Sequence, residues 1–120
     1  MKLLLVLHRK ELTAPLAAAF SHYEVHTCTH ASAALALLES LKPDILITDL
    51  RLVGMDGLTL LGRCRNKPPI LLALTDFVTT QLQDAAAAAG VQALIRIPCT
   101  VSYVRARLQQ LLDENTPSQA

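Results

Sequence analysis

The chain has 120 residues, of which 52% are hydrophobic and 18% charged, and its formal net charge is +1. This length and composition fit one domain with a sizeable apolar core and exclude disorder over most of the chain. Lys and Arg form no continuous stripe, so direct binding of nucleic acid is not expected. No apolar run approaches the roughly 20 residues that span a bilayer. The three cysteines form no CxxC pair, which fits a reducing cytoplasm.

Short continuous apolar runs alternate along the chain with longer segments of helical period. Continuous runs indicate strands covered on both faces, as in a parallel sheet, whereas an apolar stripe every three to four residues indicates a helix packed on that sheet. Pro15 is expected in the opening turn of the first helix, and Gly90 suits the left-handed end of the fourth. The expected elements in chain order are strand 3–7, helix 11–20, strand 23–28, helix 32–41, strand 45–47, helix 57–65, strand 70–74, helix 79–89, strand 94–97 and helix 101–112.

The spacing of these elements predicts the fold class. Strands recur roughly every 20–25 residues, which is the rhythm of strand–helix units in a parallel sheet. Right-handed crossovers then give a flavodoxin-like, doubly wound α/β domain, with five parallel strands in the order 2-1-3-4-5 and helices on both faces. The domain is expected to span residues 1–112. Residues 113–120 are polar and contain Pro117, so they predict a tail or the start of a linker to an output domain.

Ligands bind such a sheet at the carboxyl ends of the strands, beside the point where the strand order reverses. Polar side chains follow three of the expected strands at this edge. Asp56 and Thr100 are expected to cap the helices that follow them, and Thr75–Asp76 has the alternative role of capping the fourth helix. The residues expected around the site are His8, Asp49, Thr75 and Asp76, with Arg9, Arg51 and Arg96 nearby.

Three segments, in the correct order and spacing, resemble the receiver domain of bacterial response regulators, the CheY-like family. Residues 43–57 (PDILITDLRLVGMDG) resemble the sequence around its phosphorylated aspartate. Residues 68–75 resemble its fourth strand with a terminal hydroxyl residue, and residues 89–98 resemble its fifth strand and the following proline. The resemblance covers residues 2–112. It implies a signalling module of a two-component phosphorelay that regulates an output, commonly transcription.

The resemblance also assigns roles to single residues. It implies that Asp49 accepts a phosphoryl group from a histidine kinase and that the Thr75 hydroxyl contacts this group. Other positions depart from the family pattern. Leu7 and His8 stand in place of an acidic pair that holds Mg²⁺, Ile97 in place of a lysine, Leu94 in place of an aromatic switch residue, and Val53 in place of a proline.

These departures predict a degenerate acidic pocket. Mg²⁺ binding is expected to be weak or absent, because Asp49 and the main-chain carbonyl of Arg51 supply only two oxygen ligands. Arg9 or Arg51 is expected to reach towards Asp49 in place of the cation. Phosphoryl transfer depends on positioning and charge neutralisation, so ordinary phosphorylation becomes slow or negligible. The chain is therefore interpreted as a weakly phosphorylated receiver or as a pseudo-receiver that signals by protein contact, and not as an enzyme.

Two other functions on the same fold are weighed against this interpretation. A phosphatase with an aspartate nucleophile usually has a second acid two residues on, where this chain has Arg51. A flavin carrier needs a Ser/Thr/Gly-rich loop after the first strand, which residues 7–11 do not supply.

The helix around residues 85–89 carries little charge, and with the last helix over 103–111 it predicts a constitutive surface for a homodimer or a signalling partner.

Overall fold

The computed structural model describes residues 1–52, 54–65 and 67–115. Each predicted strand and helix is present, with ends that differ from the prediction by a few residues. The elements are β1 (Lys2–Val6), α1 (Lys10–Ala19), β2 (Glu24–Cys28), α2 (Ala31–Leu41), β3 (Ile45–Asp49), α3 (Gly57–Arg63), β4 (Ile70–Thr75), α4 (Thr80–Ala88), β5 (Ala93–Arg96) and α5 (Val101–Asn115).

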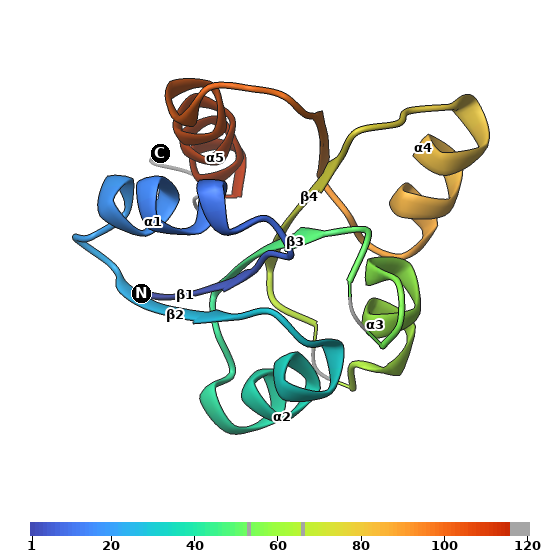
Figure 1. Ribbon diagram of the computed structural model, residues 1–120, viewed down its shortest axis with the longest axis horizontal. Coiled ribbons are helices and arrows are strands. Elements are labelled where there is room, and N and C mark those ends of the chain that lie inside the picture. The colour runs from blue at the N-terminus through green and yellow to red at the C-terminus, as the bar shows by residue number, and fades with distance from the viewer. Residues whose placement is uncertain (53, 66, 116–120) are drawn as a thin grey trace.

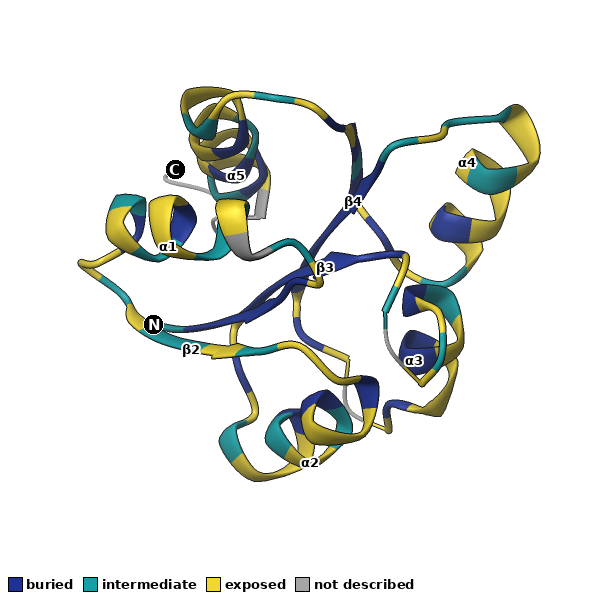
Figure 2. Cartoon of the chain, in the orientation of Figure 1, coloured by how far each residue is buried: buried dark blue, intermediate teal, exposed yellow. Residues whose placement is uncertain are grey.

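Within the described residues, five strands form one parallel sheet in the order β2-β1-β3-β4-β5, which confirms the predicted fold. Every residue of β3 and β4 is buried, including the polar residues at their carboxyl ends, and the apolar runs 45–47 and 70–74 fit strands covered on both faces. β2 lies at one edge and exposes Glu24 and Thr27, which explains its more alternating pattern. Figure 2 shows this gradient from the buried central strands to the more exposed β2.

The helices divide between the two faces of the sheet (Figure 1). α1 and α5 cover one face, whereas α2, α3 and α4 cover the other. Successive residues of β1 point to opposite faces, so Leu3 and Leu5 join the core beneath α1 and α5. Leu4 and Val6 join the core on the other side. This two-sided covering is the reason that β1 is apolar at nearly every position.

Several predicted helix ends are confirmed. Asp56 Oδ1 accepts a hydrogen bond from the Thr59 N–H at 2.7 Å and caps α3. Thr100 Oγ1 accepts one from the Tyr103 N–H at 3.0 Å at the start of α5. Gly90 has a φ of +97°, the left-handed conformation predicted after α4.

Two details expected at helix starts were wrong, namely the place of Pro15 and the alternative capping role of Thr75–Asp76. Arg9 is extended and stands as the N-cap of α1, so the helix begins at Lys10 and Pro15 lies inside it rather than in its opening turn. Thr79, not Thr75–Asp76, caps α4, because its hydroxyl accepts the Leu82 N–H at 3.0 Å.

The last helix, α5, continues to Asn115, beyond the predicted end at 112. Residues 116–120, for which a tail or linker is predicted, lie outside the described residues. Of the helices that the structure describes, none combines the length and apolarity that crossing a membrane requires.

Candidate functional site at the carboxyl edge of the sheet

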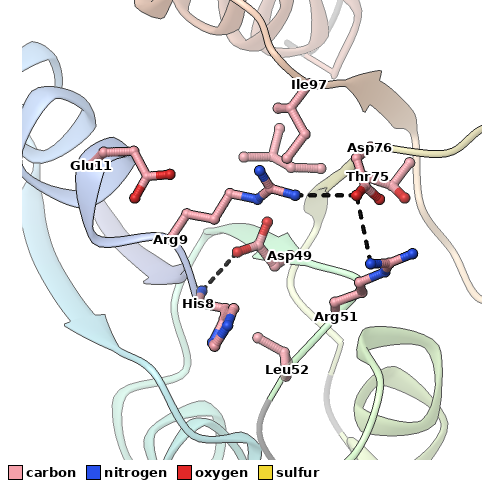
Figure 3. A pocket seen from close by; sticks show the side chains of 10 residues that line it. His8, Arg9, Glu11, Asp49, Arg51, Leu52, Thr75, Asp76 and Ile97 are labelled. Atoms are coloured by element: carbon pink, nitrogen blue, oxygen red, sulfur yellow. Dashed lines mark hydrogen bonds and ion pairs between the residues drawn. The ribbon is translucent and has the colours of Figure 1, made fainter.

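The ends of β1, β3, β4 and β5 surround a cavity of about 490 Å³ at the carboxyl edge of the sheet. This is the edge predicted from the strand order, and Figure 3 shows the side chains that face the cavity. Its lining combines buried strand ends with residues of the adjoining loops and of α1: His8, Arg9, Glu11, Asp49, Arg51, Leu52, Leu74, Thr75, Asp76 and Ile97.

Asp49 is the last residue of β3 and is only 3% exposed. Its Oδ2 accepts a hydrogen bond from the main-chain N–H of His8 at 2.7 Å. Burial raises the pKa of the Asp49 carboxyl, and this effect outweighs the nearby N–H groups and the Arg9 guanidinium, which lower it. Asp49 therefore holds a proton to a higher pH than an ordinary aspartate does.

Asp76 is the first residue after β4, and two arginines converge on it (Figure 3). Its Oδ2 lies 3.3 Å from Arg9 Nη2 and 3.6 Å from Arg51 Nη1. Its Oδ1 is buried and has no hydrogen-bond partner among the residues that the structure describes. The four side chains Arg9, Arg51, Asp49 and Asp76 thus place two positive charges beside two carboxyl groups.

The sequence placed Asp76 among the polar residues expected around the site, with capping of the fourth helix as its alternative role. Arg9 or Arg51 was expected to approach Asp49, whereas both arginines form their ion pairs with Asp76. The charge of Arg9 nevertheless acts on Asp49, since it contributes to lowering the pKa of that carboxyl. The sequence does contain a signal for this cluster. An acidic residue comes directly after β4, and arginines follow β1 and β3, whose ends lie at the same edge of the sheet.

Thr75 is buried at the end of β4, and its hydroxyl is engaged locally. The hydroxyl accepts the Phe77 N–H at 3.2 Å and donates to the Phe77 carbonyl at 3.1 Å. Thr75 lines the cavity, but its hydroxyl fixes the start of the loop that follows β4. Its predicted contact with a phosphoryl group stays a prediction.

The positions that depart from the family pattern have different surroundings. Leu7 is fully buried in the core, whereas His8 is exposed and contributes its main-chain N–H. Ile97 is buried and lines the cavity, so an apolar side chain stands where a lysine was expected for the family. Leu94 is half-buried against the core beneath α2, α3 and α4. Val53 lies outside the described residues.

The side chains at this site fit Mg²⁺ poorly. Mg²⁺ prefers six hard oxygen ligands in an octahedron. Asp49 Oδ2 already accepts a main-chain N–H, and Asp76 Oδ2 faces two guanidinium groups. Throughout the described part of the chain, no three His, Cys, Asp or Glu side chains gather as a metal ion would require. The Asp76 carboxylate is paired with guanidinium groups rather than arranged around a divalent cation.

Parts of this sequence are similar to segments of two regulatory proteins. The chain is 39% identical over 65 residues to the DNA-binding transcriptional regulator NtrC of Salmonella typhimurium, covering 52% of this chain and 14% of that protein. It is 46% identical over 44 residues to the positive alginate biosynthesis regulatory protein of Pseudomonas aeruginosa, covering 35% and 18%. The chain thus spans only a small part of the length of these relatives.

The fold is shared with solved receiver structures. The chemotaxis protein CheY4 of Vibrio cholerae superposes with a TM-score of 0.84 at 22% identity, covering 92% of this chain and 98% of that one. A CheY-like receiver domain of Methanospirillum hungatei also has a TM-score of 0.84 at 22% identity, covering 94% of each chain. Residues 7–109 match the family described as response regulator receiver domain, and this chain therefore belongs to that family.

Proposed function

We propose that this receiver domain passes on its signal by protein contact, with the Asp49 pocket kept free of metal by Arg9 and Arg51. Its family supplies the receiver modules of two-component response regulators, which are generally non-enzymatic, and does not favour the phosphatase alternative. One observation carries the proposal: both guanidinium groups that line the pocket pair with Asp76, a carboxylate that a divalent cation at this edge would need. A divalent cation would have to displace these guanidinium groups from Asp76.

Transfer of a phosphoryl group to Asp49 is disfavoured by the same surroundings. In this reaction an Asp49 oxygen forms a bond to phosphorus, the P–N bond of a kinase phosphohistidine breaks, and the released imidazole takes a proton. The attacking group must be a carboxylate, but burial raises the pKa of Asp49. Ile97 offers no charge to the phosphoryl oxygens, and the guanidinium groups are occupied by Asp76. Losing one preorganised charge of this kind costs on the order of 10²–10³ in rate.

The partner in this proposal is a histidine kinase or another signalling protein, and the location is the cytoplasm. The two relatives are described as regulators, one of them a DNA-binding transcriptional regulator. We infer a transcriptional output, attached or separate, with no DNA contact by this domain itself. The proposed contact surface comprises α4, β5 and α5, where Ala85, Ala88 and Tyr103 are exposed.

Incubation with acetyl phosphate and Mg²⁺, read by intact mass, tests the proposal. We expect no phosphoryl adduct on the wild-type chain or on the matched Asp49→Asn variant. A variant that combines His8→Asp and Ile97→Lys returns an acid and a cation to the pocket and serves as the positive comparison. A wild-type adduct that disappears in Asp49→Asn would overturn the proposal and establish Asp49 as a working phosphoacceptor.

A further inference from the structure

We propose that Arg9, Asp76 and Arg51 form an ionic clasp that sets the position of the loop between β4 and α4, residues 76–79. The inference rests on the proposed function in one respect, namely that the pocket operates without a metal ion. The clasp gives Asp76 a positioning role in this site. Its consequence is that the protein's own arginines, rather than an ion, control the surface at the start of α4.

The clasp joins three loops through a single oxygen atom. Arg9 lies between β1 and α1, Arg51 follows β3, and Asp76 follows β4. Both guanidinium groups approach Oδ2 of Asp76, at 3.3 and 3.6 Å (Figure 3). Because the three strands are fixed neighbours in the sheet, this shared carboxylate is the point at which the loops are tied together.

Local hydrogen bonds connect the clasp to the start of α4. Thr75, directly before Asp76, binds both the N–H and the carbonyl of Phe77 through its hydroxyl. Two residues further on, Thr79 caps α4 by accepting the Leu82 N–H. The Phe77 side chain between these bonds is 63% exposed. The position of Asp76 therefore decides how this aromatic ring is presented to a partner.

The other carboxylate oxygen shows why the clasp is needed. Asp76 Oδ1 is buried without a hydrogen-bond partner among the described residues. A buried oxygen without a partner destabilises the conformation that buries it. The two guanidinium groups compensate for it through Oδ2. When they are removed or screened, the balance favours outward movement of Asp76 and of the loop that it begins.

Hydrogen exchange on the full chain tests this inference at the Phe77 amide and the adjoining segment up to Leu82. The ion pairs are partly exposed, so we expect Asp76→Asn to accelerate exchange there only about two- to fivefold. Arg9→Gln should have a similar effect and should add little when it is combined with Asp76→Asn, because both remove the same interaction. Arg96→Gln removes an exposed arginine outside the cavity and should leave this exchange unchanged.

Salt provides a second readout that needs no variant. Raising the ionic strength should accelerate exchange of this segment in the wild type and have little effect in Asp76→Asn. Unchanged exchange in Asp76→Asn, together with no salt effect in the wild type, would overturn the clasp. A phosphoryl adduct on Asp49 would instead overturn the proposed function alone, because exchange in the unphosphorylated protein still decides whether the clasp exists.

Discussion

Two glycines of α3 provide a sharp test of how the floor of the pocket is packed. A Cβ added to Gly57 would lie 2.6 Å from the Asp49 main-chain oxygen and 3.0 Å from the Leu50 Cα. A Cβ added to Gly62, in the same helix, would meet nothing within 4 Å. The same substitution to alanine should therefore have opposite effects at the two positions.

The expected magnitudes follow from these contacts. The Asp49 oxygen and the Leu50 Cα are main-chain atoms that cannot turn aside, so Gly57→Ala should lower the free energy of unfolding by about 1–3 kcal/mol, as overpacking does. Gly62→Ala should raise it by about 0.5–1 kcal/mol, because alanine loses less conformational entropy in a helix. For a domain of this size each kcal/mol corresponds to roughly 3–6 °C in the midpoint of thermal unfolding.

Urea and thermal unfolding of the wild type and both variants measure these effects. The wild type should unfold between the two variants, with Gly57→Ala the least stable. Because the Asp49 carbonyl must move in Gly57→Ala, the Phe77 exchange and the Asp49 environment should change in that variant and not in Gly62→Ala. Stabilisation by both substitutions, or an unchanged Gly57→Ala, would refute the packing that places Gly57 against β3.

The remaining predictions concern the pocket charges and the proposed contact surface. Burial raises the pKa of Asp49 above its ordinary 3.8, so its contribution to stability is fully present below that pH and is lost as the pH rises through the raised pKa. The urea midpoint of the wild type should fall over this pH range relative to that of Asp49→Asn. Midpoints that change in parallel with pH in the two proteins would contradict the expected loss of stability. Calorimetric titration with Mg²⁺ should show no binding with a sub-millimolar dissociation constant. Sub-millimolar binding that is lost in Asp49→Asn would contradict a pocket in which Arg9 and Arg51 take the place of the metal ion. Replacing Ala85 and Ala88 by Glu should weaken self-association or partner binding in sedimentation experiments, whereas Asp49→Asn and the control Ala36→Glu should not. Association that responds only to Asp49 would reject this surface.

The fold was predictable because its strongest signals are repeated along the chain. The apolar runs of β1, β3 and β4 are continuous, and a strand buried on both faces requires this. Errors arose at helix starts, where the outcome depends on one or two residues. Thr75–Asp76 and Thr79 both have capping side chains, and the sequence alone did not show that Thr75 would bond to Phe77 instead.

The site was predictable in its position but not in its pairing. The strand order brings the residues after β1, β3 and β4 to one edge, so Asp49, Arg9 and Arg51 were expected together. Whether the arginines pair with Asp49 or with Asp76 depends on the length of their side chains and on how far each carboxylate is buried. Asp49 is nearly enclosed, whereas Asp76 is open enough to receive two long side chains. That distinction is three-dimensional and has no counterpart in residue spacing.

The two outer strands of the sheet have a consequence for aggregation. An open sheet edge offers free main-chain groups to strands of other molecules unless charge or shortness makes it unsuitable. At the β2 edge, Glu24 is exposed and its Oε2 lies 2.8 Å from His26 Nε2. At the opposite edge, β5 has only four residues and ends at the exposed Arg96. Growth of the sheet from chain to chain is therefore discouraged at both of these edges.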